Sequence, residues 1–187
     1  MSLRGRIGYV WGLGGIAFAV IDALIRLTPI AVKGFQYTLT ARHWLFLAGW
    51  LVFMVLIEGY RGFHRSFSPR VVVRAEHLKS DPRWLDVILA PLFCSSLYRT
   101  TRRRLIASWG MIFGIVSVIV AVRMLPQPWR GLVDAGVVGG LTVGLLSMTV
   151  WFVRAQRGMP IPFSPELGEQ EADEKTKARG LSQAPIS

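Results

Sequence analysis

The sequence predicts an all-α polytopic membrane protein, and three observations carry that prediction. Of its 187 residues, 52% are hydrophobic and only 18% are charged, compared with about 45–50% and about 25% in soluble domains. Four apolar stretches approach the roughly 20 residues that a helix needs to cross a bilayer. Lys and Arg are distributed unevenly among the segments that join these stretches. Because no backbone polar group can stay unpaired in hydrocarbon, each stretch is expected to be helical.

The four predicted spans cover residues 7–27, 43–60, 105–122 and 133–153. The first has a second interpretation as a cleaved signal peptide, because Arg4 and Arg6 precede the apolar run and Ala17-Phe18-Ala19 fits a cleavage site. Four glycines between residues 8 and 15 dilute its hydrophobicity and favour a retained, packed helix. The prediction is therefore a single membrane domain over residues 1–160.

The basic residues predict the orientation of the spans. With four spans, 17 of the 22 Lys and Arg residues lie on one side of the membrane and five on the other. Cytoplasmic loops retain positive charge, so both termini and the long connection between the second and third spans are expected in the cytoplasm. If the first span were cleaved, that connection would still lie inside.

Two segments outside the spans have a distinct composition. The first is residues 82–98, a mostly apolar run that is too short to span the membrane. Ser80-Asp81-Pro82 at its beginning is typical of a helix start. This segment is predicted to be an amphipathic helix at the cytoplasmic membrane face, or else a helix packed under the bundle. Residues 161–187 are rich in proline and mixed charge, which predicts a disordered cytoplasmic tail.

Glycines at intervals of four residues form the first group of candidate site residues. They lie in the third and fourth spans, and they are Gly110, Gly114, Gly136, Gly140 and Gly144. Glycines at this spacing let helix backbones approach closely, which favours helix packing. The packing is either internal to the chain or made with a membrane-protein partner or a second copy.

Ionisable residues in or beside the spans form the second group. Asp22 and Arg26 lie one turn apart at the predicted outer end of the first span, and Asp134 begins the fourth span at the same level. With Arg123 and Arg130 nearby, they are expected to form one polar layer near the outer face. Such residues are either interfacial ion pairs or an entry site for an ion or an anionic solute.

The basic cytoplasmic connection forms the third group. Its last cations, Arg99, Arg102, Arg103 and Arg104, are predicted to contact anionic lipid headgroups, each contributing about 1 kcal/mol near such a surface. Nucleic acid is not expected as a partner, because no recognised fold or stacking motif accompanies the charge.

Signatures of catalysis are missing from the sequence. It holds no GxxxxGK[ST] phosphate loop, no HExxH and no GxSxG motif. His43, His64 and His77 are dispersed, and Cys94 is the one cysteine, so no metal, cofactor or disulfide is predicted. The expected function is a non-catalytic accessory, assembly or scaffolding subunit that packs through its glycine faces. The alternatives are a small oligomeric transporter or channel that uses the polar layer and, more distantly, a lipid-modifying enzyme.

Three segments carry a resemblance to known proteins. EGYRGFHRSFSPRVVVRAEHL at Glu58–Leu78, PLFCSSLYRTTRRR at Pro91–Arg104 and LPQPWRGLVDAGVVGGL at Leu125–Leu141 resemble a group of uncharacterised small bacterial inner-membrane proteins. The resemblance implies a bacterial origin and an inner-membrane location. It implies no activity or ligand, because none is attached to the group.

Overall fold

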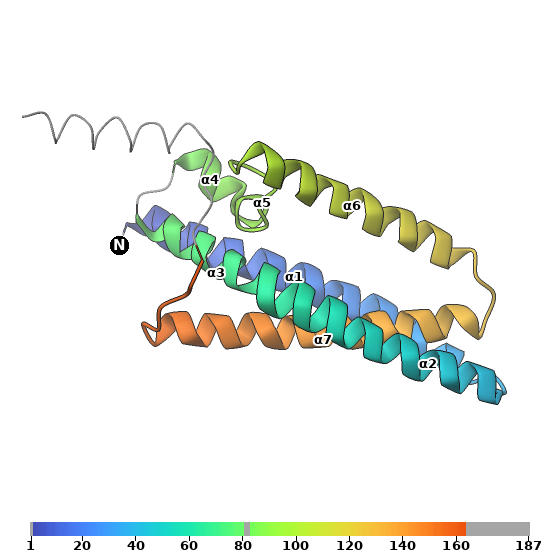
Figure 1. Ribbon diagram of the computed structural model, residues 1–187. Coiled ribbons are helices and arrows are strands. Elements are labelled where there is room, and N and C mark those ends of the chain that lie inside the picture. Colours follow the sequence, from blue (N-terminus) through green and yellow to red (C-terminus); the bar gives the residue numbers. More distant parts are fainter. Residues whose placement is uncertain (1, 81–82, 164–187) are drawn as a thin grey trace, which may run out of the picture.

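The computed structural model describes residues 2–80 and 83–163, and over that part the chain is helical with no β-strand. Four continuous helices are long and apolar enough to cross a membrane, as predicted (Figure 1). They are α1 (Leu3–Gly34), a helix that runs from Ala41 to Ser80, α6 (Arg102–Arg123) and α7 (Trp129–Gln156). The predicted tail lies outside the described residues from position 164 onward.

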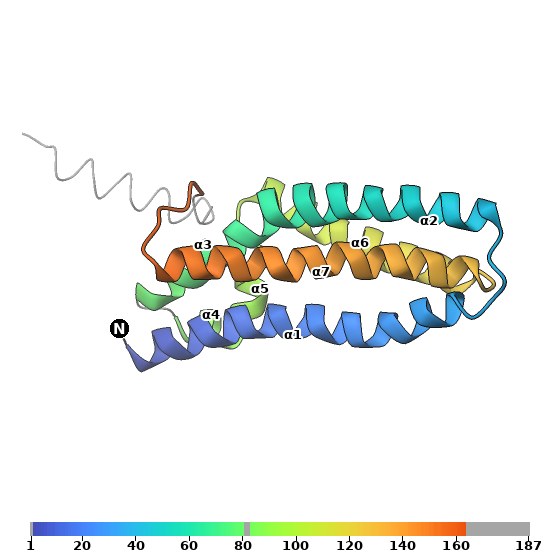
Figure 2. The same ribbon diagram turned by 90° about the horizontal axis from the view of Figure 1, so that it is seen from below.

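Three of these helices form a layer with α7 in the middle (Figure 2). One side of α7 packs against α1 and the other against the helix from Ala41 to Ser80. The layer is tight at the end opposite the N-terminus, which we call the far end, because Gly34 and Gly131 bring two backbones together there. A Cβ on Gly34 would lie 2.8 Å from the Cα of Gly131.

The helix from Ala41 to Ser80 extends well beyond the predicted second span. It is built from four parts, which are α2 (Ala41–Phe53), the π-helix η1 (Met54–Phe67), α3 (Ser68–His77) and the 3₁₀ turn η2 (Leu78–Ser80). The connection to the third span, which the sequence predicted to begin after residue 60, is therefore helical as far as Ser80. Pro69 does not interrupt the helix, because it follows the π-helix at the start of α3, where a missing amide donor removes no α-helical hydrogen bond.

The first span is also longer than predicted. α1 continues to Gly34 with Pro29 inside it, whereas the sequence predicted an end at residue 27. Because the helix is longer, residues expected at its outer end, Asp22 above all, lie near its middle.

The predicted interfacial helix over residues 82–98 is two short helices. They are α4 (Trp84–Ile88) and α5 (Ala90–Cys94), separated at Leu89, whose backbone leaves the helical region with φ −94° and ψ 22°. Pro91 follows at once and lies in the first turn of α5, where proline is tolerated.

The densest core lies at the end of the molecule that carries the N-terminus, and we call this part the headpiece. It consists of the first turns of α1, the last turns of α7, α3, η2, α4 and α5 (Figure 1). Residues Val71, Val72, Ala75 and Leu78 of α3 and η2 share one helical face and are at most 1% exposed. That face packs against the remaining core residues, which are Tyr9, Leu13, Ile16, Ala90, Phe93, Cys94, Met148 and Trp151.

Helix α6 stands apart from the layer (Figure 1). None of its 22 residues is buried, and it contacts the other helices sparsely, chiefly α7. A helix that is apolar on all sides and has so few neighbours in its own chain is typical of a segment that is surrounded by lipid or contacts another protein.

Candidate functional site

The predicted packing glycines of α7 contact other helices of the same chain. Gly140 lies against Met54, whose carbonyl oxygen would be 3.2 Å from an added Cβ, and Gly144 lies against the ring of Phe63, at 2.6 Å. Gly136 faces Trp50 in the same way, and the Trp50 indole donates a hydrogen bond to the carbonyl of Val133 at 3.0 Å. These three glycines therefore let α7 pack closely against α2 and η1.

The glycines of α6 have no such neighbours within the described part of the chain. A Cβ added at Gly110 or Gly114 would meet nothing within 4 Å. They belong to a longer row of small, exposed side chains at alternating intervals of three and four residues, which we call the small-residue face. It consists of Ala107, Gly110, Gly114, Ser117 and Ala121.

The small-residue face points away from the protein's own bundle. The partly buried residues of α6 include Ser108 and Ile112, which mark the side turned toward the rest of the chain. At 100° per residue, Gly110 and Gly114 lie on largely the opposite side of the helix. The two glycine motifs, identical in spacing, thus have different surroundings in α7 and α6.

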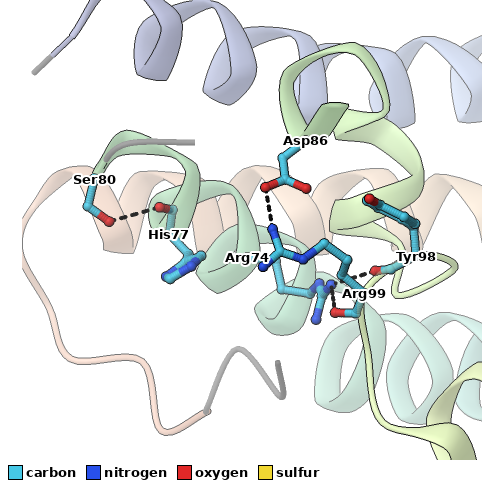
Figure 3. A network of polar contacts seen from close by, with 6 residues as sticks. All are labelled: Arg74, His77, Ser80, Asp86, Tyr98 and Arg99. Atoms are coloured by element: carbon cyan, nitrogen blue, oxygen red, sulfur yellow. Dashed lines mark hydrogen bonds and ion pairs between the residues drawn. The ribbon is translucent and has the colours of Figure 1, made fainter. Parts of the chain in front are cut away.

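What holds α6 to the headpiece is a polar network around Arg74 (Figure 3). The Arg74 side chain is 1% exposed, and its guanidinium donates hydrogen bonds to three backbone carbonyls. These are the carbonyls of Phe93 at 2.5 Å, Tyr98 at 2.9 Å and Arg99 at 3.0 Å. All three lie at the end of α5 or in the loop that leads into α6, so Arg74 fixes the base of α6.

A second contact fixes the same loop. Asp86 of α4, which is 4% exposed, accepts an ion-paired hydrogen bond from Arg99 (Figure 3). Ser96 and Arg99 adopt positive φ angles of 62° and 47°, which are uncommon for residues with a side chain. Arg99 was predicted to contact lipid headgroups, but its guanidinium is engaged by Asp86, whereas Arg102 and Arg103 are exposed.

The five residues of the predicted polar layer do not lie together. Asp22 pairs with Arg26 on α1, with 2.8 Å between Oδ2 and Nε, and Asp134 pairs with Arg130 on α7 at 4.0 Å. Asp134 lies three residues from Gly131, whereas Asp22 lies 12 residues from Gly34. At 1.5 Å per residue the two acids differ by about 13 Å along the layer. Arg123, at the last position of α6, is exposed.

Two features of the site were missed by sequence reasoning. Arg74 was counted only as one cation of a basic loop, although its place in a VVVRAEHL segment with helical apolar spacing could have indicated a buried position. His64 of η1 contacts Ser147 of α7, with 3.0 Å between Nδ1 and Oγ, and its backbone carbonyl accepts a hydrogen bond from the Trp151 indole at 2.9 Å. No local sequence pattern predicts a π-helix, so the contacts of His64 could not be predicted from the sequence.

Cys94 lies in the core beneath this network. Burial raises the pKa of its thiol to about 12, against a smaller lowering by the charge of Arg74. In the described residues, no three His, Cys, Asp or Glu side chains gather in a way that could hold a metal ion.

Comparison with known proteins identifies no relative. No family model, no curated protein and no solved structure matches the chain. A function can therefore be inferred only from the geometry of the chain itself.

Proposed function

We propose that this protein is a non-catalytic subunit of a bacterial inner-membrane assembly, in which α6 binds a transmembrane helix of a partner. The observation that carries the proposal is the exposed small-residue face of α6. The partner helix belongs either to another membrane protein or to a second copy, and a crosslinking experiment distinguishes the two.

The physical basis is close backbone approach. Lipid tails are as apolar as leucine, so helices associate in a bilayer through van der Waals packing and weak polar contacts rather than through the hydrophobic effect. Small residues maximise that packing because no side chain keeps the backbones apart. In α7 the same pattern already packs against α2 and η1, while in α6 it is open, which supports a partner from outside the chain.

The proposed orientation places the headpiece and both termini in the cytoplasm. The excess of Lys and Arg on that side supports it. Retention of the first span is supported by α1 itself, because two of the glycines in its first half are packed against the headpiece. Gly8 faces Val87 and Leu78, and Gly12 faces Cys94 and Ala90.

Anionic lipid headgroups are the second proposed partner. In α4, Trp84, Leu85 and Ile88 are 58–64% exposed, whereas Asp86 and Val87 are buried. One face of α4 thus packs on the bundle and the other is free to lie in the membrane surface, as expected of an interfacial segment. The exposed cations at the start of α6, Arg102 and Arg103, with the partly buried Arg104, follow α4 and α5 in the sequence and favour an anionic leaflet.

Crosslinking from the small-residue face tests the proposed function. A photoreactive amino acid at position 117 of the full chain, expressed in a bacterial membrane, should give one discrete adduct that mass spectrometry identifies as a partner or a second copy. The same group at position 112, on the opposite side of α6, should not give that adduct. Gly114→Leu should abolish it, whereas Gly49→Leu, at another glycine with open space around it, should leave it intact. A monomer without an adduct, or an adduct unchanged by Gly114→Leu, would contradict the proposal.

A further inference from the structure

The ion pair between Asp22 and Arg26 lies at the middle of α1. Asp22 is 12 residues before Gly34, which contacts α7 at the far end, and 13 residues after Tyr9. Tyr9 contacts α7 at the headpiece end, where its hydroxyl accepts a hydrogen bond from Gln156 at 2.9 Å. In a membrane-spanning α1 this puts the Asp22 carboxylate about 18 Å from the far end of the helix, too deep for its short side chain to reach water.

The pair is only partly covered by the protein. The side chains of Asp22 and Arg26 are 40% and 75% exposed. In the part of the chain that the structure describes, Asp22 has one polar partner, the Nε of Arg26. Ionisable side chains in spans almost always face a protein interior or a water-filled cavity, because hydrocarbon gives them no hydrogen bonds. An uncovered pair at mid-depth therefore indicates an interface that the isolated chain leaves open.

The face of α1 that carries the pair is the one that binds α4 and α5. Gly8, Gly12 and Gly15 contact those two helices, with Pro91 closing the contact at Gly15. Asp22 lies seven residues, about two turns, after Gly15, and Arg26 lies four residues after Asp22, so both continue the same line along α1. That line faces the side of the layer on which α4, α5 and α6 lie (Figure 1). Beyond Gly15 the helix continues for 19 residues to Gly34, about 28 Å, which is close to the thickness of a bilayer core.

We propose that this face of α1 receives a transmembrane helix of a different protein, one that carries an uncharged polar side chain, such as a carboxamide, at mid-depth. The inference rests on the proposed membrane insertion but is independent of the small-residue face of α6. A carboxamide suits the pair because it donates to the second oxygen of Asp22 and accepts from a second N–H of Arg26. It adds no charge to a pair that is already neutral.

Symmetry argues against a second copy at this position. Two copies related by an axis normal to the membrane hold Asp22 at the depth of Asp22 and Arg26 at the depth of Arg26, which brings like charges to the same level of the interface even where each Asp22 pairs with Arg26 across it. Like charges opposite each other at mid-depth are unfavourable. A different helix has no such constraint.

Synthetic transmembrane peptides test this. The full-length protein, labelled with a donor dye through Gln36→Cys, is reconstituted into vesicles of phosphatidylcholine and phosphatidylglycerol. Acceptor-labelled peptides of about 20 leucines and alanines carry either one central Asn or Leu at that place. The Asn peptide should bind about tenfold more tightly, by energy transfer, because a membrane-buried amide hydrogen bond has this order of effect.

Removing both charges supplies the decisive variant. Asp22→Leu combined with Arg26→Leu should abolish the preference for Asn, while the protein still floats with the vesicles and melts no earlier than the parent. Arg130→Leu combined with Asp134→Leu removes a second acid–base pair at i,i+4 of the described residues and should keep the preference, as should Gly114→Leu.

Three outcomes would overturn the inference. They are equal binding of the two peptides, a preference that survives the Asp22 and Arg26 double variant, and energy transfer between protein copies that this double variant abolishes. Failure of the parent protein to float with the vesicles would instead contradict membrane insertion, and with it the proposed function.

Discussion

Arg74 holds Phe93 in two ways at once. Its Nε donates a hydrogen bond of 2.5 Å to the Phe93 carbonyl, and its guanidinium carbon lies 4.2 Å from the centre of the Phe93 ring. The ring covers the cation while the carbonyls of Phe93, Tyr98 and Arg99 accept its hydrogen bonds. This one side chain therefore ties α3 to the end of α5 and to the loop that starts α6.

Arg74→Lys should destabilise the headpiece by about 3 kcal/mol. An ammonium cannot reach three carbonyls with the planar fork of a guanidinium, and each buried carbonyl left unpaired is costly. The measurement is the temperature at which the Cys94 thiol becomes reactive in detergent. Arg70→Lys is the matched control, because Arg70 lies on the same helix and donates to the Ser66 hydroxyl at the partly exposed surface. Equal shifts for the two variants would contradict the assigned role.

Ser96→Gly should raise the stability of the protein by about 0.5–1 kcal/mol. Ser96 has a φ of 62°, a conformation that glycine adopts without the steric cost of a Cβ. The neighbouring Ser95→Gly should instead lower stability, because Ser95 donates a hydrogen bond to the Pro91 carbonyl at 2.8 Å and has a φ of −78°. The same thermal readout applies, and stabilisation by both glycines or by neither would show that the backbone at position 96 carries no strain.

Cys94 should resist alkylation until the headpiece opens. The thiolate is the reactive form, and burial raises the pKa of this thiol to about 12. Between pH 7 and pH 9 the exposed thiol of a Leu85→Cys variant should label faster as it ionises. Cys94 should label at least about 100-fold more slowly throughout. Mass spectrometry of intact protein follows both rates, and comparable labelling of the two thiols in the folded protein would contradict the burial of Cys94 in the core.

Gly144→Ala and Gly114→Ala should have different effects on stability, although each glycine belongs to a row of glycines spaced four residues apart. A methyl at Gly144 would lie 2.6 Å from the Phe63 ring, whereas at Gly114 it meets open space. Overpacking of this kind costs about 1–3 kcal/mol, so Gly144→Ala should lower the apparent melting temperature and Gly114→Ala should not. If the two alanine variants melt alike in isolated protein, the distinction between the internal and external glycine faces is wrong.

Sequence reasoning located the four apolar helices well, because length and hydropathy are local properties that a bilayer imposes on any span. Their ends were less predictable. The second helix continues past the predicted end at residue 60, because the π-helix before Pro69 lets that proline lie in the first turn of α3. The end of α1 depends on Gly34 meeting Gly131, a contact between residues almost 100 positions apart that no local pattern encodes.

The amino-acid sequence by itself determined which segments are apolar helices and on which side of them the positive charge gathers, because both follow from composition along the chain. Only the tertiary structure decided that Gly136, Gly140 and Gly144 are packed within the protein while Gly110 and Gly114 stay open. It also decided that Asp22 and Asp134 lie in separate ion pairs. The physical reason is that spacing defines a face of a helix, but what covers that face is fixed by long-range packing.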